Sequence, residues 1–309
     1  MRIVFMGTPE FAVASLSALY EAGHTIAGVF TRMDTPKNRG MKLLPPPVKV
    51  YALEKGFPVF QPKGLRKAEV QQQLAALEPE LIVVAAYGRI LPPAVLELPK
   101  YGCLNVHASL LPDYRGASPI NACILHGETK AGVTIMQMDA GLDTGDMLLK
   151  ESTDILPEES YGSLHDRLAE IGGAAIVKAI ALLEQGALSG EKQPEEGSYA
   201  PMIRTEDCQI SFGGSALEIS CRIRAYDPQP GAFCQLGGGK IKLFGGAVAQ
   251  PEGVLGQPGS ILKVDRKGVY IACGQGSVLV AQVQAAGGKK MPADAYFRGH
   301  QAMLEERFC

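Results

Sequence analysis

Three polar side chains occupy positions from which they could carry out chemistry together: Asn105, His107 and Asp143. Asn105 and His107 are two residues apart in Cys103–His107, a run that is typical of a buried strand, so both should point to one face at its carboxyl end. Asp143 follows a second apolar run, Val133–Met138, in a loop that contains glycines. An amide, an imidazole and a carboxylate at one edge of a sheet can form a catalytic centre.

Acyl transfer to an external nucleophile is the chemistry that suits these groups, because no serine or cysteine at this edge is an obvious activated nucleophile. If the attacking group is an amine, His107 can take up its proton and Asp143 can orient the imidazole ring. Asn105 can donate a hydrogen bond to the developing oxyanion, which is worth roughly 3 kcal/mol of barrier in comparable sites. An isolated Asn-x-His pair is more often a loop anchor, so this interpretation depends on the surrounding motifs.

The elements that must position these side chains are strands and helices that alternate along the first 155 residues. Short β-branched runs, beginning with Arg2–Met6, are separated by helical stretches. This order predicts an α/β fold with an open, doubly wound, mostly parallel sheet, in which ligands bind beyond the carboxyl ends of the strands. The residues that we expect to meet in one crevice are those just after Met6, Ala86, His107 and Met138.

The character of the sequence changes after a long helix that we expect at Tyr161–Gln185. The polar stretch Gly186–Pro201 contains proline and glycine and is typical of a linker. Beyond it, one helix and several short strand candidates with glycine-rich turns favour a small, OB-like β-barrel. We therefore expect a catalytic domain at 1–188, a linker at 189–204 and an OB-like C-terminal domain at 205–309.

Composition is that of an ordinary globular protein. Of 309 residues, 46% are hydrophobic and 20% are charged, which argues against disorder, collagen and coiled coil. No run approaches the ~18 apolar residues of a membrane span, and the N-terminus lacks the apolar segment of a signal peptide. The seven cysteines are odd in number and form no CxxC pair, as in reduced cytosolic proteins. We expect a cytoplasmic protein that does not bind membranes.

Two kinds of cofactor site are disfavoured by the motifs. Gly7 alone does not make the G-x-G-x-x-G pattern of dinucleotide binding, so we expect no nicotinamide cofactor. His107 and Asp143 have no third ligand at metal-binding spacing, so we expect no metal site. The formal net charge of −2 gives no sign of a polyanionic partner from the whole-chain balance.

Taken together, the motifs resemble the folate-dependent formyltransferase family. Asn105-Val-His107 is followed by Ser109-Leu-Leu-Pro112 and Gly116, and Asp143 lies in Gly141-Leu-Asp-Thr-Gly145. The resemblance extends over essentially the whole chain and implies Asn105, His107 and Asp143 as catalytic residues and 10-formyl-tetrahydrofolate as the formyl donor. It implies folate contacts from Ser109, Leu110, Leu111 and Pro112 and from Val84, Tyr87, Gly88 and Ile90. From pattern alone, the alternatives are a structural turn for the first segment and a plain core strand for the second.

The loop Thr31–Pro47 carries several cations and follows an expected strand at the same edge. Lys37, Arg39 and Lys42 could contact the phosphates of an RNA acceptor end, with a solvated surface loop as the alternative from charge alone. The resemblance implies initiator tRNA charged with methionine as the acceptor, hence a role in translation initiation during protein biosynthesis. It also implies that the OB-like domain binds the tRNA and that the protein is a monomer.

Two other functions remain open. A relative with the same three catalytic residues could formylate a small amine, such as a nucleotide or a nucleotide sugar, but would need no RNA-binding domain after residue 205. A non-catalytic folate or RNA binding module could keep the fold. The C-terminal half also departs from the family, because it carries Gln229 and Phe212 where tryptophan is common, and the chain has no tryptophan.

Overall fold

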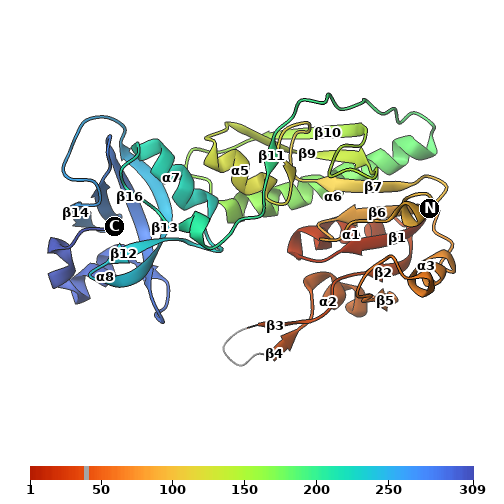
Figure 1. Cartoon of the computed structure of the whole chain (residues 1–309), viewed down its shortest axis with the longest axis horizontal. Coiled ribbons are helices and arrows are strands. Elements are labelled where there is room, and N and C mark those ends of the chain that lie inside the picture. Colours follow the sequence, from red (N-terminus) through yellow and green to blue (C-terminus); the bar gives the residue numbers. More distant parts are fainter. Residues whose placement is uncertain (38–41) are drawn as a thin grey trace. The chain divides into compact units, whose positions relative to one another are not determined.

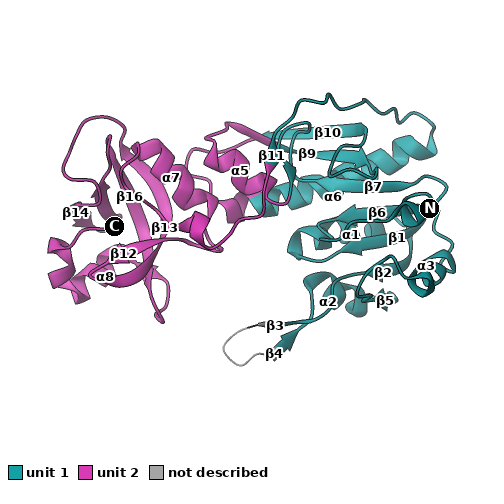
Figure 2. Cartoon of the chain, viewed as in Figure 1, with its two compact units in different colours: residues 1–116, 132–153, 165–199 teal, residues 117–131, 154–164, 200–309 magenta. Residues whose placement is uncertain are grey.

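The computed structural model describes residues 1–37 and 42–309, which form two compact units (Figures 1 and 2). Unit 1 comprises Met1–Gly116, Gly132–Thr153 and His165–Tyr199. Unit 2 comprises Ala117–Ala131, Asp154–Leu164 and Ala200–Cys309. The chain therefore enters unit 2 twice in short excursions before its last 110 residues complete that unit.

A seven-stranded sheet is the centre of unit 1, with the strand order β10-β9-β7-β6-β1-β2-β5. The strands are β1 (Arg2–Gly7), β2 (Thr25–Phe30), β5 (Val59–Phe60), β6 (Leu81–Ala85), β7 (Cys103–His107), β9 (Lys130–Gln137) and β10 (Met147–Asp154). The five strands from β7 to β5 run parallel to their neighbours, which confirms the expected mostly parallel α/β sheet. β6 is buried along its whole length, because its unbroken apolar sequence suits a strand covered on both faces.

Helices of unit 1 follow the strands as the α/β pattern requires. They are α1 (Glu10–Glu21), α2 (Pro47–Glu54), α3 (Ala68–Ala75), α4 (Pro93–Leu96) and α6 (Tyr161–Glu184), whose first turn belongs to unit 2. Two consecutive glycines allow α6 to pack closely. A Cβ at Gly172 would lie 2.8 Å from a methyl carbon of Val106, and one at Gly173 would lie 3.0 Å from the carbonyl oxygen of Ala14. The strand that carries Asn105 and His107 is thus held directly against a helix.

The expectation that the residues just after Met138 lie at the carboxyl end of β7 is wrong. β9 runs antiparallel to β7, with Leu104 opposite Gln137 and His107 opposite Thr134. The residues after Met138 therefore leave the sheet beside the start of β7 and not beside its carboxyl end. A buried apolar run predicts a strand but does not encode its direction, which is set by the strand's connections.

Two small two-stranded ladders complete unit 1. The basic loop forms a hairpin of β3 (Thr35–Lys37) and β4 (Lys42–Leu44), and the four residues between these strands lie outside the described part of the chain. β8 (Arg115–Gly116) lies beside β11 (Tyr199–Ala200), and the amide of Arg115 donates to the carbonyl of Ser198. The stretch that we expected to be a linker thus contributes residues up to Tyr199 to unit 1.

Unit 2 is built around an antiparallel sheet with the strand order β12-β13-β16-β15-β14, and β17 pairs with β16. The strands are β12 (Ala232–Leu236), β13 (Gly239–Gln250), β14 (Ile261–Asp265), β15 (Gly268–Ala272), β16 (Ser277–Ala285) and β17 (Met291–Pro292). The helices are α5 (Pro119–Leu125), α7 (Ala216–Ala225), α8 (Ala293–Gly299) and two short 3-10 turns, Glu206–Cys208 and Gln301–Glu305. These elements confirm the expected antiparallel β domain at the C-terminal end.

The last three residues join the two edges of this sheet. Arg307 bridges Ser260, next to the start of β14, and Cys309 exchanges two backbone hydrogen bonds with Gln235 of β12. Between them, the side chain of Phe308 is 1% exposed and packs in the apolar core of the unit. The C-terminal segment therefore closes the sheet into a small barrel, which protects edges that would otherwise be open to pairing.

All seven cysteines are unpaired thiols, and only Cys309 is exposed. Burial raises the pKa of the Cys103 and Cys123 thiols to about 12, so these groups stay neutral. In the described part of the chain, no helix combines the length and the apolar character that crossing a membrane requires.

Candidate active site

The end of β7 carries Asn105 and His107 on one face, as strand alternation predicts. Both are almost completely buried, with 8% and 5% of their surface exposed. β7 lies between β6 and β9, so Asn105 is paired on both sides, whereas His107 is paired with Thr134 of β9. A rigid strand thus presents an amide and an imidazole from a largely dry surface.

The imidazole of His107 has a different neighbour at each ring nitrogen. Nε2 lies 3.0 Å from the carbonyl oxygen of Tyr114, and since a carbonyl can only accept, Nε2 donates. Nδ1 lies 3.7 Å from Oδ2 of Asp143, which is longer than a hydrogen bond. In the neutral ring Nδ1 is therefore the unprotonated nitrogen, and it faces a carboxylate that can pair with it once it takes up a proton.

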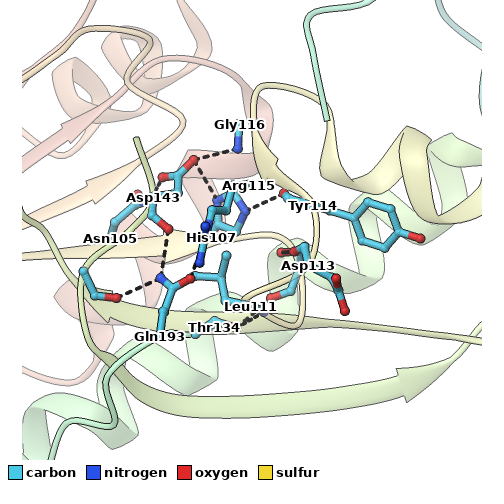
Figure 3. A network of polar contacts seen from close by, with 12 residues as sticks. Asn105, His107, Leu111, Asp113, Tyr114, Arg115, Gly116, Thr134, Asp143 and Gln193 are labelled. Carbon is cyan, nitrogen blue, oxygen red and sulfur yellow. Dashed lines mark hydrogen bonds and ion pairs between the residues drawn. The ribbon is translucent and has the colours of Figure 1, made fainter. Parts of the chain in front are cut away.

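Asp143 is held by both of its carboxylate oxygens (Figure 3). Oδ2 accepts a hydrogen bond of 2.9 Å from the amide of Gly116, and Oδ1 accepts a longer one of 3.4 Å from Nδ2 of Asn105. The backbone of Asp143 has φ +54°, a left-handed conformation that a non-glycine residue rarely adopts. The loop thus returns from the far end of β7 to bring Asp143 beside Asn105 and His107, although the strand direction behind our expectation was wrong.

The segment Ser109–Pro112 follows β7 and is anchored to β9. Oγ1 of Thr134 donates to the carbonyl of Ser109 at 2.7 Å and accepts from the amide of Leu111 at 3.1 Å. Ser109 also donates through Oγ to the carbonyl of Asp113 at 2.6 Å. Ser109 and Leu111 are buried, whereas Leu110 and Pro112 are half-buried. The carbonyl and hydroxyl of Ser109 and the amide of Leu111 therefore already have hydrogen-bond partners within the protein.

The second expected folate segment begins directly beside Asn105, because Val84 of β6 is its register partner in β7. Val84 and Tyr87 are buried in one apolar cluster, whereas the side chain of Ile90 is 78% exposed. The chain turns sharply between them, with φ +74° at Gly88. The hydroxyl of Tyr87 is buried and makes no hydrogen bond among the described residues, and this burial raises the pKa of the phenol.

The residues expected to contact RNA are only partly described. Arg39 lies outside the described residues, and Lys37 and Lys42 end β3 and begin β4. The base of this hairpin is anchored by Asp34, whose carboxylate accepts from Nζ of Lys49 at 2.8 Å. The described contacts do not join the hairpin to Asn105, His107 or Asp143.

Sequence reasoning missed most of the contacts that support the three polar side chains. Tyr114 acts through its backbone carbonyl, which leaves no residue-specific signal in the sequence, whereas Gly116, with φ +104°, was quoted in the motif but without its role. Gln193, from the stretch expected to be a linker, contacts the loop that carries Asp143. Within residues 1–37 and 42–309, no group of three His, Cys, Asp or Glu side chains gathers closely enough to hold a metal ion.

Family models match both halves of the chain. The model described as formyl transferase matches residues 1–180, and the one described as formyl transferase, C-terminal domain, matches residues 202–301. Full-length relatives agree. A methionyl-tRNA formyltransferase of Marinobacter nauticus is 49% identical over 305 residues, covering 98% of each chain. One of Trichlorobacter lovleyi is 47% identical and covers 98% of this chain and 95% of its own length.

Solved structures share the fold at low identity. HypX from Aquifex aeolicus, in complex with tetrahydrofolic acid, aligns with a TM-score of 0.67 at 19% identity over 96% of this chain, which spans about half of that protein (47%). An N-formyltransferase from Helicobacter canadensis, in complex with folinic acid and dTDP-3-aminofucose, aligns with a TM-score of 0.66 at 18% identity over 94% of this chain and 100% of its own.

Proposed function

The chain belongs to the formyl transferase family, among its methionyl-tRNA formyltransferases, and we propose that it moves the formyl group of 10-formyl-tetrahydrofolate to the α-amino group of methionine on initiator tRNA. The observation that carries this proposal is the meeting of Asn105, His107 and Asp143 at the end of β7 in a chain of this family. These groups suit acyl transfer to an amine without a nucleophile from the protein.

His107 is the general base and general acid in this mechanism. The amine nitrogen forms a bond to the formyl carbon, and the bond between that carbon and N10 of the folate breaks. Nδ1 of His107 takes up the proton that the amine loses and returns a proton to N10 as it leaves, so that the ring is neutral again at the end of the reaction. The carbonyl of Tyr114 keeps Nε2 in the donor role, which leaves Nδ1 for this exchange.

Asn105 and Asp143 stabilise charges that appear during the transfer. Asn105 has two amide protons, of which one is directed at Asp143, and the other can donate to the formyl oxygen as it becomes negative. Asp143 carries the charge that balances His107 once its ring is protonated, at a separation of 3.7 Å. Both roles require the side chains to be in place before the substrate arrives.

We propose that the folate lies against Ser109, Leu110, Leu111 and Pro112 on one side and Val84, Tyr87, Gly88 and Ile90 on the other. The two segments follow the adjacent strands β7 and β6, and such strand ends are where α/β sheets bind ligands. The exposed side chain of Ile90 supplies apolar surface, and the hydroxyl of Tyr87 is a buried polar group that has no partner among the described residues. Two solved structures of the same fold were determined with tetrahydrofolic acid and with folinic acid, which supports a folate as the ligand.

For the tRNA, we propose contacts from Arg39, Lys37 and Lys42 and from the C-terminal domain. The functional division is a catalytic domain at 1–188, a linker at 189–204 and a tRNA-binding, OB-like domain at 205–309, supported by the match of residues 202–301 to the C-terminal family model. We further propose that the protein works as a monomer in the cytoplasm. A small-amine acceptor is not favoured, because relatives that are 46–49% identical over the full chain are named methionyl-tRNA formyltransferases.

A comparison of acceptors, each in a separate incubation, tests the proposed function. The purified protein is incubated with 10-formyl-tetrahydrofolate and with methionyl initiator tRNA, free methionine, a glycinamide nucleotide or an amino sugar nucleotide. We expect formylation of the charged tRNA alone. Efficient formylation of a small amine would reassign the acceptor, and no transfer to any of the four would overturn the enzymatic function.

A further inference from the structure

One side chain outside the three catalytic residues connects both loops that surround His107. Gln193 donates from Nε2 to the carbonyl oxygens of Asp143 and Gly145, each at 2.8 Å. Its Oε1 accepts from Nε of Arg115 at 3.0 Å. Every hydrogen-bonding group of this carboxamide is therefore directed at the surroundings of His107, as Figure 3 shows.

Arg115 carries this connection to the second loop. Its guanidinium is buried, with 3% of the residue exposed, and it also donates to the carbonyl of Pro194 at 2.9 Å. Arg115 lies between Tyr114, whose carbonyl accepts from His107, and Gly116, whose amide donates to Asp143. Gln193 thus contacts the Asp143 loop through Nε2 and the Tyr114–Gly116 loop through the side chain of Arg115.

Both loops need such support, because each contains a strained residue. Asp143 and Tyr114 have φ values of +54° and +61°, in a region that costs a non-glycine residue roughly 1–2 kcal/mol. These two residues supply the neighbours of the two nitrogens of the His107 ring. A strained conformation persists only where surrounding contacts hold it, so the loop geometry depends on bonds such as those of Gln193.

We propose that Gln193 is a positioning residue that holds the Asp143 loop and the Tyr114–Gly116 loop in the arrangement that His107 requires. This inference rests on the proposed function, since it assigns Gln193 a part in the same site. Because Gln193 acts on the geometry of the reacting groups and not on substrate binding, its loss should lower kcat and leave KM nearly unchanged.

Gln193→Met tests this, since methionine has a similar shape but neither donates to the two carbonyls nor accepts from Arg115. We expect kcat for formyl transfer to fall by about 10- to 100-fold, while KM for the folate and for the tRNA changes by less than about threefold. The exposed neighbouring residue gives the matched control, Lys192→Ala, which should retain wild-type kcat. A Gln193→Met enzyme that unfolds cooperatively at the wild-type temperature and keeps wild-type kcat would overturn the proposal.

If Gln193→Met does not fold, Gln193→Glu replaces it. Its carboxylate keeps the bond to Arg115 but cannot donate to the carbonyls of Asp143 and Gly145, so the same loss of kcat is expected. Wild-type kcat in this variant would equally overturn the proposal.

A spectroscopic measurement separates this proposal from the proposed function. NMR follows hydrogen exchange of the His107 Nε2–H, which donates to Tyr114, with its signal identified through His107→Gln. We expect exchange at least about tenfold faster in the folded Gln193 variant than in the wild type. Unchanged exchange would overturn the role of Gln193, whereas faster exchange in a protein that formylates no acceptor would uphold it and overturn the proposed function alone.

Discussion

Different interactions stabilise the active edge of unit 1 and the barrel of unit 2, each within its own unit. In unit 1, Asn105, His107 and Asp143 are polar side chains held by a few hydrogen bonds, from Asn105 to Asp143 and from the latter two to loop backbone. In unit 2, a continuous apolar core is closed by Phe308 near the C-terminus. Substitutions at the active edge should therefore lower kcat with little effect on the free energy of unfolding. Substitutions in the barrel core should lower the free energy of unfolding with little effect on kcat.

The largest effect on stability is expected from Phe308→Ala. The ring packs against Phe212 and Phe297, with centroids 5.7 and 6.3 Å away, and its removal leaves a cavity at the point where the barrel closes. Unfolding free energy measured by chemical denaturation should fall by about 3–5 kcal/mol.

A matched control for this variant is Val254→Ala, which removes apolar atoms from a side chain that is 84% exposed. It should change the unfolding free energy by less than about 0.5 kcal/mol. Equal effects of the two substitutions would show that the C-terminal segment does not contribute to the core.

Asn105→Ala should have the opposite signature. Loss of the amide donor should lower kcat by about 10²–10³-fold, which is about 3–4 kcal/mol of barrier. The unfolding free energy should change by no more than about 1 kcal/mol, because only one long hydrogen bond to Asp143 is lost. Steady-state kinetics and denaturation of the same preparation check both numbers, and a variant with nearly full turnover would remove Asn105 from the mechanism.

A smaller loss of stability is expected from Ser215→Ala at the start of α7 in unit 2. The Ser215 side chain accepts from the amide of Glu218, whose carboxylate accepts from the Ser215 amide in turn. Removal of this cap should cost about 1 kcal/mol in denaturation experiments. The rate of formyl transfer at temperatures below thermal unfolding should be unchanged. A drop in kcat would contradict the expectation that substitutions in unit 2 affect stability and not chemistry.

The smallest effect concerns pH at the base of the basic hairpin in unit 1. The hydrogen bonds from Lys49 and then Gln61 hold the pKa of Asp34 below its ordinary value of 3.8. A carboxyl whose pKa is lower in the folded than in the unfolded chain stabilises the fold above pH 3.8. This contribution is lost as the pH falls through the pKa of the folded state. Lys49→Met should therefore lower stability at neutral pH, and the difference from the wild type should narrow below pH 3.8, with exposed Lys63→Met as the control.

Sequence reasoning reached some parts of this architecture better than others. Strand alternation is a local property, so Asn105 and His107 could be placed on one face from the sequence. Asp143 was correctly associated with them from the motifs, but through a strand taken to be parallel. Strand direction and the left-handed turn at Asp143 depend on contacts far apart in the chain, which local patterns do not carry.

Supporting contacts were the least predictable. The carbonyl of Tyr114 and the closure of the barrel by Cys309 use backbone groups that any residue could supply. Gln193 lies in a polar stretch whose composition is that of a linker, and only the folded loops show what it contacts. In unit 2, one helix and several short strands were expected, whereas the short helix α8 was not.

A single-turnover comparison of wild type and His107→Ala tests the central claim most directly. Excess enzyme, loaded with 10-formyl-tetrahydrofolate, is mixed with limiting methionyl initiator tRNA, and the rate of formyl-methionine formation is followed together with tRNA binding. The account predicts a rate about 10²–10⁴-fold lower in His107→Ala, with unchanged tRNA affinity. A variant that transfers the formyl group at the wild-type rate would contradict the assignment of the active site to the end of β7.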